Sequence, residues 1–332
     1  MKFLRSSSWL NCVRALLLIP PAVPALCAAP SARAEDCTLQ KRASIKIEAM
    51  PGEAPVVLVK LNDTERRFVV DTGSPDSGVA LRVSQELQLF PQEIRGSEFY
   101  TNGKEIDRYV IVKSLQLGQM PASRKILLLM PPDILPLGVD GLLGADWLTN
   151  FDLDFDFGKR DLNLMSPKHC KGRVVYWTAD YTTVPFVLSE SRHLVIPVML
   201  DGKRVSAAID TGSVKTFISE SSVSRAFGLT EKSPGAEPPP GAYAAGSWKF
   251  KYRFESLSFE GVTVKHPLLY VRADDDERTF SRKHVDKTQF DPVTRVDLEH
   301  QDVVVGMDVL RSLHVYVCYD EHMLYISAAD AH

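Results

Sequence analysis

The sequence predicts an all-β protein built from two similar halves, and three observations predict it. The tetrapeptide Asp-Thr-Gly-Ser occurs at residues 71–74 and again at 210–213, each time directly after an apolar run. A shift of 139 positions aligns residues 44–74 with residues 183–213 without a gap, and the apolar positions coincide. Alternating apolar stretches bounded by Gly, Pro, Asn and Asp turns are typical of strands. Each half is therefore expected to begin as a β meander.

Two further segments repeat downstream. Residues 99–118 resemble residues 242–261, with a Tyr, a Gly turn and two alternating stretches that predict a hairpin. Residues 140–166 resemble residues 302–327, which predicts an apolar strand ending in Gly, a short helical turn and two more strands. The second half carries about 23 extra residues, and its Pro-rich and charged stretches predict surface loops for them.

The strand expected near residue 154 has a polar face of three aspartates. Asp152, Asp154 and Asp156 alternate with Phe and Leu. Alternation of this kind puts one set of side chains on each face of a strand. We therefore expect the aspartates to face solvent.

The chain begins with a stretch typical of a secretory signal peptide. Basic residues precede an apolar run broken by prolines, and a small-residue site ends at Ala34. We expect cleavage near Ala34 and a periplasmic or secreted protein without stable membrane insertion. The expected organisation is a signal peptide at 1–34, an N-terminal lobe at 35–170, a linker at 171–182 and a C-terminal lobe at 183–332.

Charge and cysteine content exclude several classes of function. Removal of residues 1–34 takes four basic and no acidic residues, which changes the formal charge from −3 to −7. A mildly acidic chain without basic clusters is not expected to bind nucleic acid. Three cysteines remain without C-x-x-C spacing, and a disulfide between Cys37 and Cys170 is plausible, with Cys318 a buried strand thiol.

All eight histidines follow residue 168, so no motif that occurs in both halves contains a histidine. No H-E-x-x-H, G-x-S-x-G or Walker motif occurs, and we expect no metal and no cofactor.

Asp-Thr-Gly-Ser is the polar motif that occurs in both halves. A carboxylate at the end of an apolar strand is costly to bury unless hydrogen-bond donors surround it. Gly73 and Gly212 permit tight turns whose N–H groups can supply them.

If a pseudo-twofold axis brings Asp71 against Asp210, the two carboxyl groups cannot both ionise and would share one proton. One carboxylate can then act as general base toward a water while the other, protonated, donates to a substrate carbonyl. Amide hydrolysis without metal, cofactor or covalent intermediate follows from such a pair.

These residues resemble the aspartic peptidases of the pepsin and retropepsin superfamily, in the form of two fused retropepsin-like units. The resemblance covers Asp71–Ser74 and Asp210–Ser213, each after an apolar pair, and the apolar-Gly elements at 142–144 and 304–306. It implies two closed β-barrel lobes related by pseudo-twofold symmetry, with an active-site cleft between them.

The resemblance also implies roles for individual residues. The catalytic pair would be Asp71 and Asp210, and the threonines of the two turns would tie the loops together. The turn serines would bond the outer carboxylate oxygens. Two hairpins would form flaps over the cleft. The implied residues are the loops Thr72, Gly73, Ser74, Thr211, Gly212 and Ser213 and the flaps Tyr100, Gly103, Tyr243 and Gly246.

The function implied is that of an aspartic endopeptidase acting on a peptide or protein substrate. One alternative is a periplasmic module with the same fold that binds a peptide without cutting it. A second is an enzyme in which like lobes from two chains pair, in place of the two lobes of one chain. The short linker at 171–182 favours a monomer with an intramolecular site, because it gives the second lobe a high effective concentration.

Overall fold

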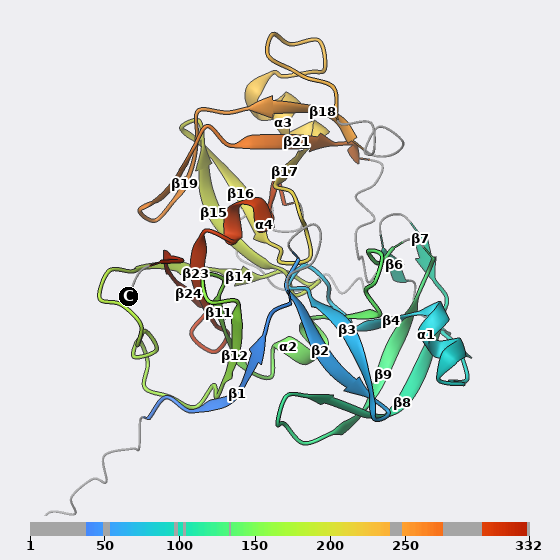
Figure 1. Ribbon diagram of the computed structural model, residues 1–332. Coiled ribbons are helices and arrows are strands. Elements are labelled where there is room, and N and C mark those ends of the chain that lie inside the picture. Colours follow the sequence, from blue (N-terminus) through green and yellow to red (C-terminus); the bar gives the residue numbers. More distant parts are fainter. Residues whose placement is uncertain are drawn as a thin grey trace, which may run out of the picture. The chain divides into compact units, whose positions relative to one another are not determined.

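The structure is a computed structural model that describes residues 38–48, 54–95, 99–101, 104–132, 134–239, 248–274 and 301–330. Residues 37–332 form one compact unit (Figure 1). Strands make up most of the regular structure in its described residues, where the helices have at most eight residues.

In its described residues, the first half contains twelve strands and two short helices. They are β1 (Lys41–Lys46), β2 (Val56–Leu61), β3 (Thr64–Val70), β4 (Gly78–Ala80), α1 (Leu81–Glu86), β5 (Gln92–Glu93), β6 (Phe99–Thr101), β7 (Lys104–Ile106), β8 (Arg108–Leu117), β9 (Ser123–Met130), β10 (Gly141–Leu143), α2 (Ala145–Leu148), β11 (Asp152–Asp156) and β12 (Asp161–Met165).

The second half continues in the same order. Its elements are β13 (Thr182–Pro185), β14 (Val187–Leu188), β15 (Leu194–Leu200), β16 (Lys203–Ile209), β17 (Phe217–Ser219), α3 (Glu220–Phe227), β18 (Trp248–Arg253), β19 (Ser256–Phe259), β20 (Val262–Lys265), β21 (Leu268–Arg272), β22 (Val303–Val305), α4 (Met307–Leu310), β23 (Leu313–Cys318) and β24 (Met323–Ala328).

The first half forms a closed barrel. Its strands follow the order β2-β3-β10-β4-β9-β8-β5, and pairing of β2 with β8 closes the ring. Closure leaves no long free edge in this ring. We call this assembly, within residues 54–148, the first barrel.

The second half repeats this arrangement with one interruption. Its nine-stranded sheet follows the order β18-β21-β17-β22-β16-β15-β19-β20, with β14 added beside β15. The long strand β8 corresponds here to two strands, β18 and β19, separated by residues 254–255. The ring is therefore interrupted at one corner. We call this assembly, within residues 187–310, the second barrel.

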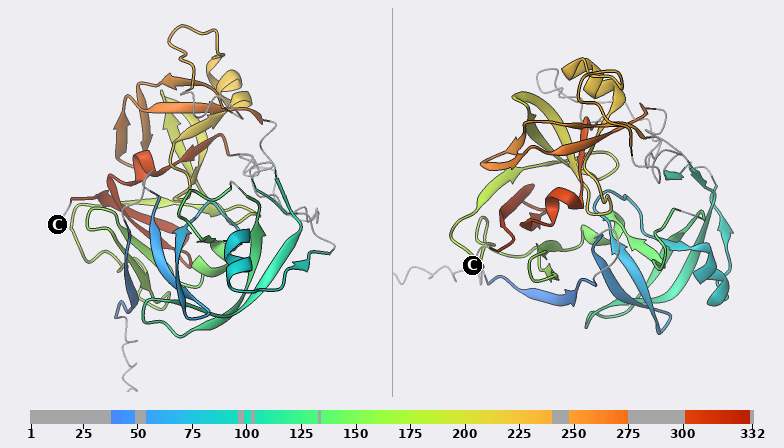
Figure 2. Two further views of the ribbon diagram at one scale, coloured as in Figure 1. Left: turned by 45° about the vertical axis from the view of Figure 1, so that its right-hand side comes forward. Right: turned by 45° about the horizontal axis from the view of Figure 1, so that its top comes forward.

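A sheet shared by both halves joins the barrels. Its order is β1-β12-β11-β23-β24-β13, with three strands from each half. Figure 1 shows β11 and β12 beside β23 and β24, and Figure 2 shows the same grouping from two other sides. The sequence predicts that the last strands of each half belong to its own lobe, whereas the structure pairs β11 with β23 across the repeat.

The duplication persists in the structure. β3 and β16, β4 and β17, and the starts of α1 and α3 are each separated by 139 positions. From β10 and β22 onward the separation is 162, because the additional 23 residues of the second half lie between α3 and β22. The predicted fold class, mainly β with two repeat-related barrels, is confirmed, apart from the interrupted ring of the second.

The prediction that the three aspartates of β11 face solvent is wrong. Asp152 and Asp154 are fully buried, and Asp156 is 5% exposed. The reason is the shared sheet, in which β11 is a central strand whose polar face is covered by the segment that follows β12. Asp154 accepts hydrogen bonds from Asn163 and Tyr176 and contacts His314.

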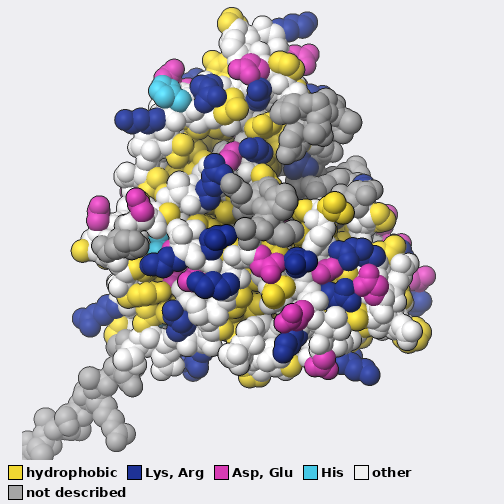
Figure 3. Space-filling view, in the orientation of Figure 1, with side chains coloured by type: hydrophobic (Ala, Val, Ile, Leu, Met, Phe, Trp, Pro, Cys, Tyr) yellow, Lys and Arg dark blue, Asp and Glu magenta, His cyan; other side chains and the backbone are white. Residues whose placement is uncertain are grey.

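The structure also bears on the expectations for the cysteines and for a membrane-spanning segment. Cys318 is a free, buried thiol in β23, as expected. Cys170 is disulfide-bonded, and its expected partner Cys37 lies outside the described residues, as does the expected signal peptide. Within the described residues, no helix has the length and apolar character needed to span a membrane. On the face shown in Figure 3, basic and acidic side chains are interspersed.

Candidate active site

The two Asp-Thr-Gly-Ser turns occupy corresponding places at the ends of β3 and β16. Each of these strands pairs in parallel with a short apolar strand, β10 or β22. The Asp71 N–H donates to the Leu143 carbonyl at 3.0 Å, and the Asp210 N–H donates to the Val305 carbonyl at 3.0 Å. The predicted apolar-Gly elements thus lie directly beside the turns.

Reciprocal threonine contacts bring the turns together. The Thr72 N–H donates to Thr211 Oγ1, and the Thr211 N–H donates to Thr72 Oγ1, both at 3.1 Å. Each hydroxyl in turn donates across the interface, Thr72 to the Ile209 carbonyl at 2.8 Å and Thr211 to the Val70 carbonyl at 2.7 Å. Both threonines are buried. The structure therefore joins the two loops through the threonines.

The two carboxyl groups meet beside this contact. A Cβ placed on Gly73 would lie 2.3 Å from Asp210 Cγ, and one placed on Gly212 would lie 2.3 Å from Asp71 Cγ. Each glycine therefore allows its turn to pass against the opposite aspartate. Backbone N–H groups supply the expected donors, since Gly73 donates to Asp71 Oδ1 at 2.9 Å and Gly212 to Asp210 Oδ1 at 2.8 Å.

The surroundings favour protonation of this pair. Burial raises the pKa of Asp71 well above its usual value, and the negative charge of Asp210 raises it further. Burial also raises the pKa of Asp210, although His193 and the Gly212 N–H oppose the rise. A carboxyl pair of this kind retains one proton at a pH where an isolated aspartate would have lost it.

The turn serines have different partners from those that the resemblance implied. Ser74 Oγ donates to the Asp76 carbonyl at 2.9 Å, and Ser213 Oγ donates to the Lys215 carbonyl at 2.8 Å. These hydroxyls stabilise the continuation of each turn, because a carbonyl two residues onward is within their reach. The Ser213 backbone N–H, and not its hydroxyl, donates to Asp210 Oδ1 at 3.1 Å.

A hydrogen-bonded pair of side chains, repeated in both halves, holds the segment that follows each turn. Ser77 donates through its N–H and its hydroxyl to Asp146 Oδ1, at 2.8 and 2.6 Å. Thr216 donates in the same way to Asp308 Oδ1, at 2.9 and 2.6 Å. Asp146 and Asp308 are the second residues of α2 and α4. The short helices after the apolar-Gly elements therefore hold the loops that carry the carboxyl pair.

Residues 57–147 match the family model described as aspartyl protease. This segment contains β3, the first Asp-Thr-Gly-Ser turn and the apolar-Gly element behind it. The resemblance inferred from the sequence is confirmed for residues 57–147.

Two other comparisons accompany this match. No curated protein matches the chain by sequence. Among solved structures, the crystal structure of basic 7S globulin from soybean is similar with a TM-score of 0.48 and 7% sequence identity, covering 89% of this chain and 96% of that one.

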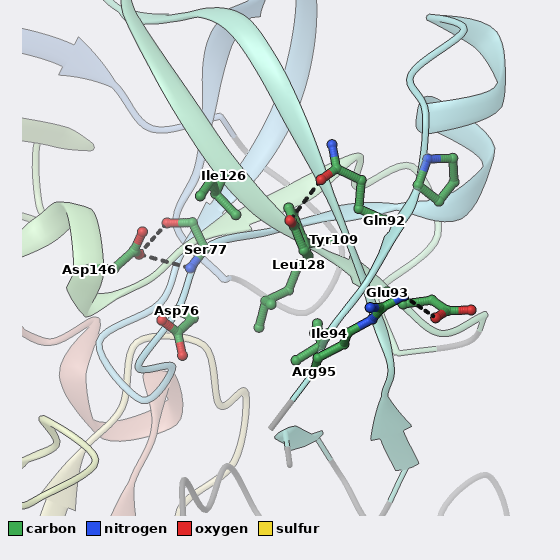
Figure 4. A pocket seen from close by; sticks show the side chains of 11 residues that line it. Asp76, Ser77, Gln92, Glu93, Ile94, Arg95, Tyr109, Ile126, Leu128 and Asp146 are labelled. Carbon is green, nitrogen blue, oxygen red and sulfur yellow. Dashed lines mark hydrogen bonds and ion pairs between the residues drawn. The ribbon is translucent and has the colours of Figure 1, made fainter. Parts of the chain in front are cut away.

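A cavity of about 1100 Å³ opens within the segment that matches the family model. Asp76, five residues beyond Asp71, lies on its wall with Ser77 and Asp146, and Leu128 of β9 forms part of its apolar lining. Figure 4 shows Tyr109 of β8 on the same cavity, where its hydroxyl donates to Gln92 at 2.8 Å. The cavity thus combines apolar and charged walls, and it includes residues that follow the first active-site turn in sequence.

The expected flaps are described only in part. β6 and β7 form a two-stranded hairpin in which Tyr100 pairs with Glu105. Gly103 lies outside the described residues, as do Tyr243 and Gly246 of the second expected flap. Their role as flaps stays a prediction.

One residue beside the pair has no repeated signal in the sequence. His193 precedes β15 and is 8% exposed, and its charge interacts with that of Asp210. The corresponding position in the first half is Ala54, so the duplication does not identify His193. Strand register does identify it, because it directly precedes the strand that pairs with β16, which ends at Ile209.

Among the described residues, one group has ligand atoms close enough for a metal, and it lies in the shared sheet. Asp152, His169 and Cys318 have ligand atoms within 4.8 Å of one another. Hydrogen bonds already engage them, because His169 Nε2 contacts Asp152 Oδ2 at 2.7 Å and Tyr316 donates to the same oxygen at 3.2 Å. Burial raises the pKa of the Cys318 thiol, which disfavours the thiolate that a metal requires.

Proposed function

We propose that the protein is an aspartic endopeptidase that hydrolyses peptide bonds with a water activated between Asp71 and Asp210. The observation that carries the proposal is the joining of two repeat-related carboxyl groups by the reciprocal Thr72 and Thr211 bonds. Their raised pKa values support a shared proton. The match of residues 57–147 to the aspartyl protease family supports the same class of enzyme.

The chemistry follows from one carboxylate and one carboxylic acid in contact. The carboxylate takes a proton from the water as its oxygen attacks the substrate carbonyl carbon, while the acid gives its proton to the carbonyl oxygen. The tetrahedral diol then collapses. The carboxyl group that gained the water proton protonates the leaving nitrogen, the C–N bond breaks, and the other carboxylate accepts a proton from the diol. The pair returns to its original state with one proton.

The substrate proposed is an extended peptide. Strand edges commonly bind extended peptides through backbone hydrogen bonds, with alternate side chains entering pockets. The cavity beside Asp76 is large enough to receive side chains, with Leu128 as an apolar contact and Asp76 as a charged one.

Single substitutions of the two aspartates test the proposal. The chain should cleave denatured casein or a peptide library at some pH between acid and neutral, and pepstatin should inhibit cleavage. Asp71→Asn and Asp210→Asn should each abolish cleavage, whereas Asp63→Asn, a change in the exposed turn between β2 and β3, should not.

Three outcomes would contradict parts of this proposal. Absence of cleavage at every pH, together with failure to bind pepstatin, would favour a peptide-binding module. Substantial activity in both single variants would reject the pair as the catalytic site. Recovery of activity on mixing the two inactive variants would indicate that sites form between chains, in place of the proposed monomer.

We further propose that the mature protein is periplasmic or secreted after cleavage near Ala34. The basic residues, the proline-broken apolar run and the small-residue site of residues 1–34 support this. Amino-terminal sequencing of the protein recovered from the periplasm or medium should begin near Glu35. Recovery of an intact amino terminus in the cytoplasm would contradict it.

A further inference from the structure

The strand register of the second barrel places His193 opposite Asp210. β15 and β16 are antiparallel, and Leu194 pairs with Ile209 at the end of their ladder. The same register, continued by one step beyond the ladder, sets His193 opposite Asp210, and the charges of the two groups interact. Residues opposite one another in an antiparallel pair have their Cβ atoms about 5 Å apart, which is close enough for charges to interact.

The first barrel has no such histidine. β2 and β3 repeat the arrangement with Val56 paired with Val69, so the same register sets Ala54 opposite Asp71. Ala54 is buried and has no group that can titrate or donate a hydrogen bond. Two carboxyl groups with repeat-related backbones therefore have different neighbours.

A tight turn and a neighbouring amide fix the histidine. The His193 N–H donates to Ser189 Oγ at 3.0 Å, and the Ser189 N–H donates to the His193 carbonyl at 3.1 Å. Gln301 Nε2 lies 3.0 Å from His193 Nδ1. Since an amide NH₂ only donates, Nδ1 is the acceptor and the neutral ring carries its proton on Nε2.

His193 Nε2 is buried, and no group among the described residues forms a well-aligned hydrogen bond with it. The Gly73 backbone lies close enough to raise the pKa of the ring as a weak hydrogen-bond partner, and Gly73 itself lies against the Asp210 carboxylate. The Nε2–H is thus held in the part of the site where the two active-site loops meet.

We propose that His193 is a positioning residue that favours the ionised form of Asp210 and so leaves the shared proton on Asp71. This rests on the proposed function, and it assigns roles within it. Asp210 is the general base that takes the water proton, and Asp71 is the acid that protonates the substrate carbonyl.

The titration behaviour of the groups agrees with this assignment. Burial raises the pKa of Asp210, and His193 is the strongest of the influences that lower it. Burial lowers the pKa of His193, and the charge of Asp210 is the strongest of the influences that raise it. Asp71, without a histidine, has its pKa raised well above its usual value.

The other charged groups near His193 are accounted for. Arg192, its neighbour in the turn, is exposed and interacts with the charge of Asp146. Asp302, next to Gln301, is engaged by Ser206, Ser222 and Arg225. Within the described residues, Asp210 is therefore the charged group that acts on the ring.

Histidine titration by nuclear magnetic resonance tests the proposal without any need for activity. The imidazole ¹⁵N signals of the full chain are followed against pH, and His193 is assigned by the loss of its signals in His193→Gln. Asp210→Asn should lower the pKa of His193 by about one unit, because an anion within a few ångströms is lost. Asp71→Asn should leave it nearly unchanged. Equal effects of the two changes, or no effect of either, would overturn the proposal.

The pH profile of kcat/KM gives a second test on folded, active variants. His193→Ala, which reproduces the first barrel, should move the acid limb upward by about one pH unit, because the carboxylate loses a group that favours its charge. His266→Ala, at an exposed histidine of the same barrel, should leave the profile unchanged. A lower kcat with an unmoved acid limb would show a merely structural role. If the chain cleaves nothing, the proposed function fails, and the titration above still decides the charge assignment.

Discussion

Thr72 and Thr211 lie 139 positions apart and exchange backbone-to-hydroxyl hydrogen bonds of equal length, 3.1 Å each. Their hydroxyls also donate to the carbonyls of Ile209 and Val70, the residues two positions before the opposite threonine. Four buried hydrogen bonds thus connect two loops that are distant in sequence. The position of one aspartate depends on the loop of the other.

Removal of one threonine hydroxyl should therefore cost both stability and activity. Thr211→Ala leaves the Thr72 N–H and the Val70 carbonyl buried without partners, and each such loss costs about 1–3 kcal/mol. Urea denaturation should show a loss of about 3 kcal/mol, and peptidase activity should fall sharply. Thr211→Ser keeps the hydroxyl and should retain most of both. Equal losses in the two variants would mean that the methyl group, and not the hydrogen bonds, matters.

A side chain on either active-site glycine should displace the opposite aspartate. In Gly73→Ala the added Cβ would lie 2.3 Å from Asp210 Cγ, well inside contact distance, and in Gly212→Ala it would meet Asp71 in the same way. We expect both variants to lose activity and stability. Gly202→Ala is a suitable control, because it has no neighbour within 4 Å and a positive φ of 73°, so it should lose about 1 kcal/mol and keep its activity. Full activity of Gly73→Ala would contradict this packing.

Stability should depend on pH in a direction set by the buried carboxyl pair. Asp71 and Asp210 have raised pKa values, so the folded chain binds more protons than the unfolded chain above about pH 3.9. Their contribution is fully present below that pH and is lost as the pH rises through the raised values. Asp71→Asn should therefore increase the free energy of unfolding at neutral pH, measured by urea denaturation at pH 4 and pH 7.

Asp156 provides a control, because its pKa is shifted in the opposite direction. Burial raises its pKa, but the hydrogen bonds and charge of Lys159 and the charge of His314 lower it more, so the net shift is downward. Its contribution is present above the unfolded pKa and is lost as the pH falls through the folded value. Asp156→Asn should destabilise the protein at neutral pH and have no effect in strong acid. A gain in stability at neutral pH from both substitutions would contradict the assigned directions.

The parts of the fold that the sequence predicts are those with local, repeated signals. The apolar strands β3 and β16, the glycine turns after them and the apolar-Gly elements all have patterns that are visible twice. The shared sheet has no such signal, because pairing of β11 with β23 depends on how the two halves meet. A strand in which aspartates alternate with apolar residues is predicted to have one exposed face. In the protein another segment covers that face, so the predicted exposure of Asp152 and Asp154 was wrong.

In the candidate site too, the residues that the sequence predicts are those that occur in both halves. Asp71 and Asp210 follow from the duplication, whereas the serine partners depend on turn geometry that the sequence does not specify. His193 is visible only when strand register is followed one residue past the end of a ladder. His193 has no counterpart in the first half, so the duplication gives no signal for it.

The buried polar contacts of the shared sheet should contribute far more to stability than surface ion pairs do. Asp154 is fully buried, accepts hydrogen bonds from Asn163 and Tyr176 and contacts His314 of the other half. Asp154→Ala leaves three polar side chains without this partner, and loss of one member of a buried pair costs about 3–5 kcal/mol. The pair of Lys46 with Asp161 links neighbouring strands of the same sheet, but the Lys46 side chain is 77% exposed, so Lys46→Ala should cost less than about 1 kcal/mol. Urea denaturation of the two variants measures the difference. A loss in Asp154→Ala no greater than that in Lys46→Ala would mean that apolar packing, and not this polar cluster, joins the two halves.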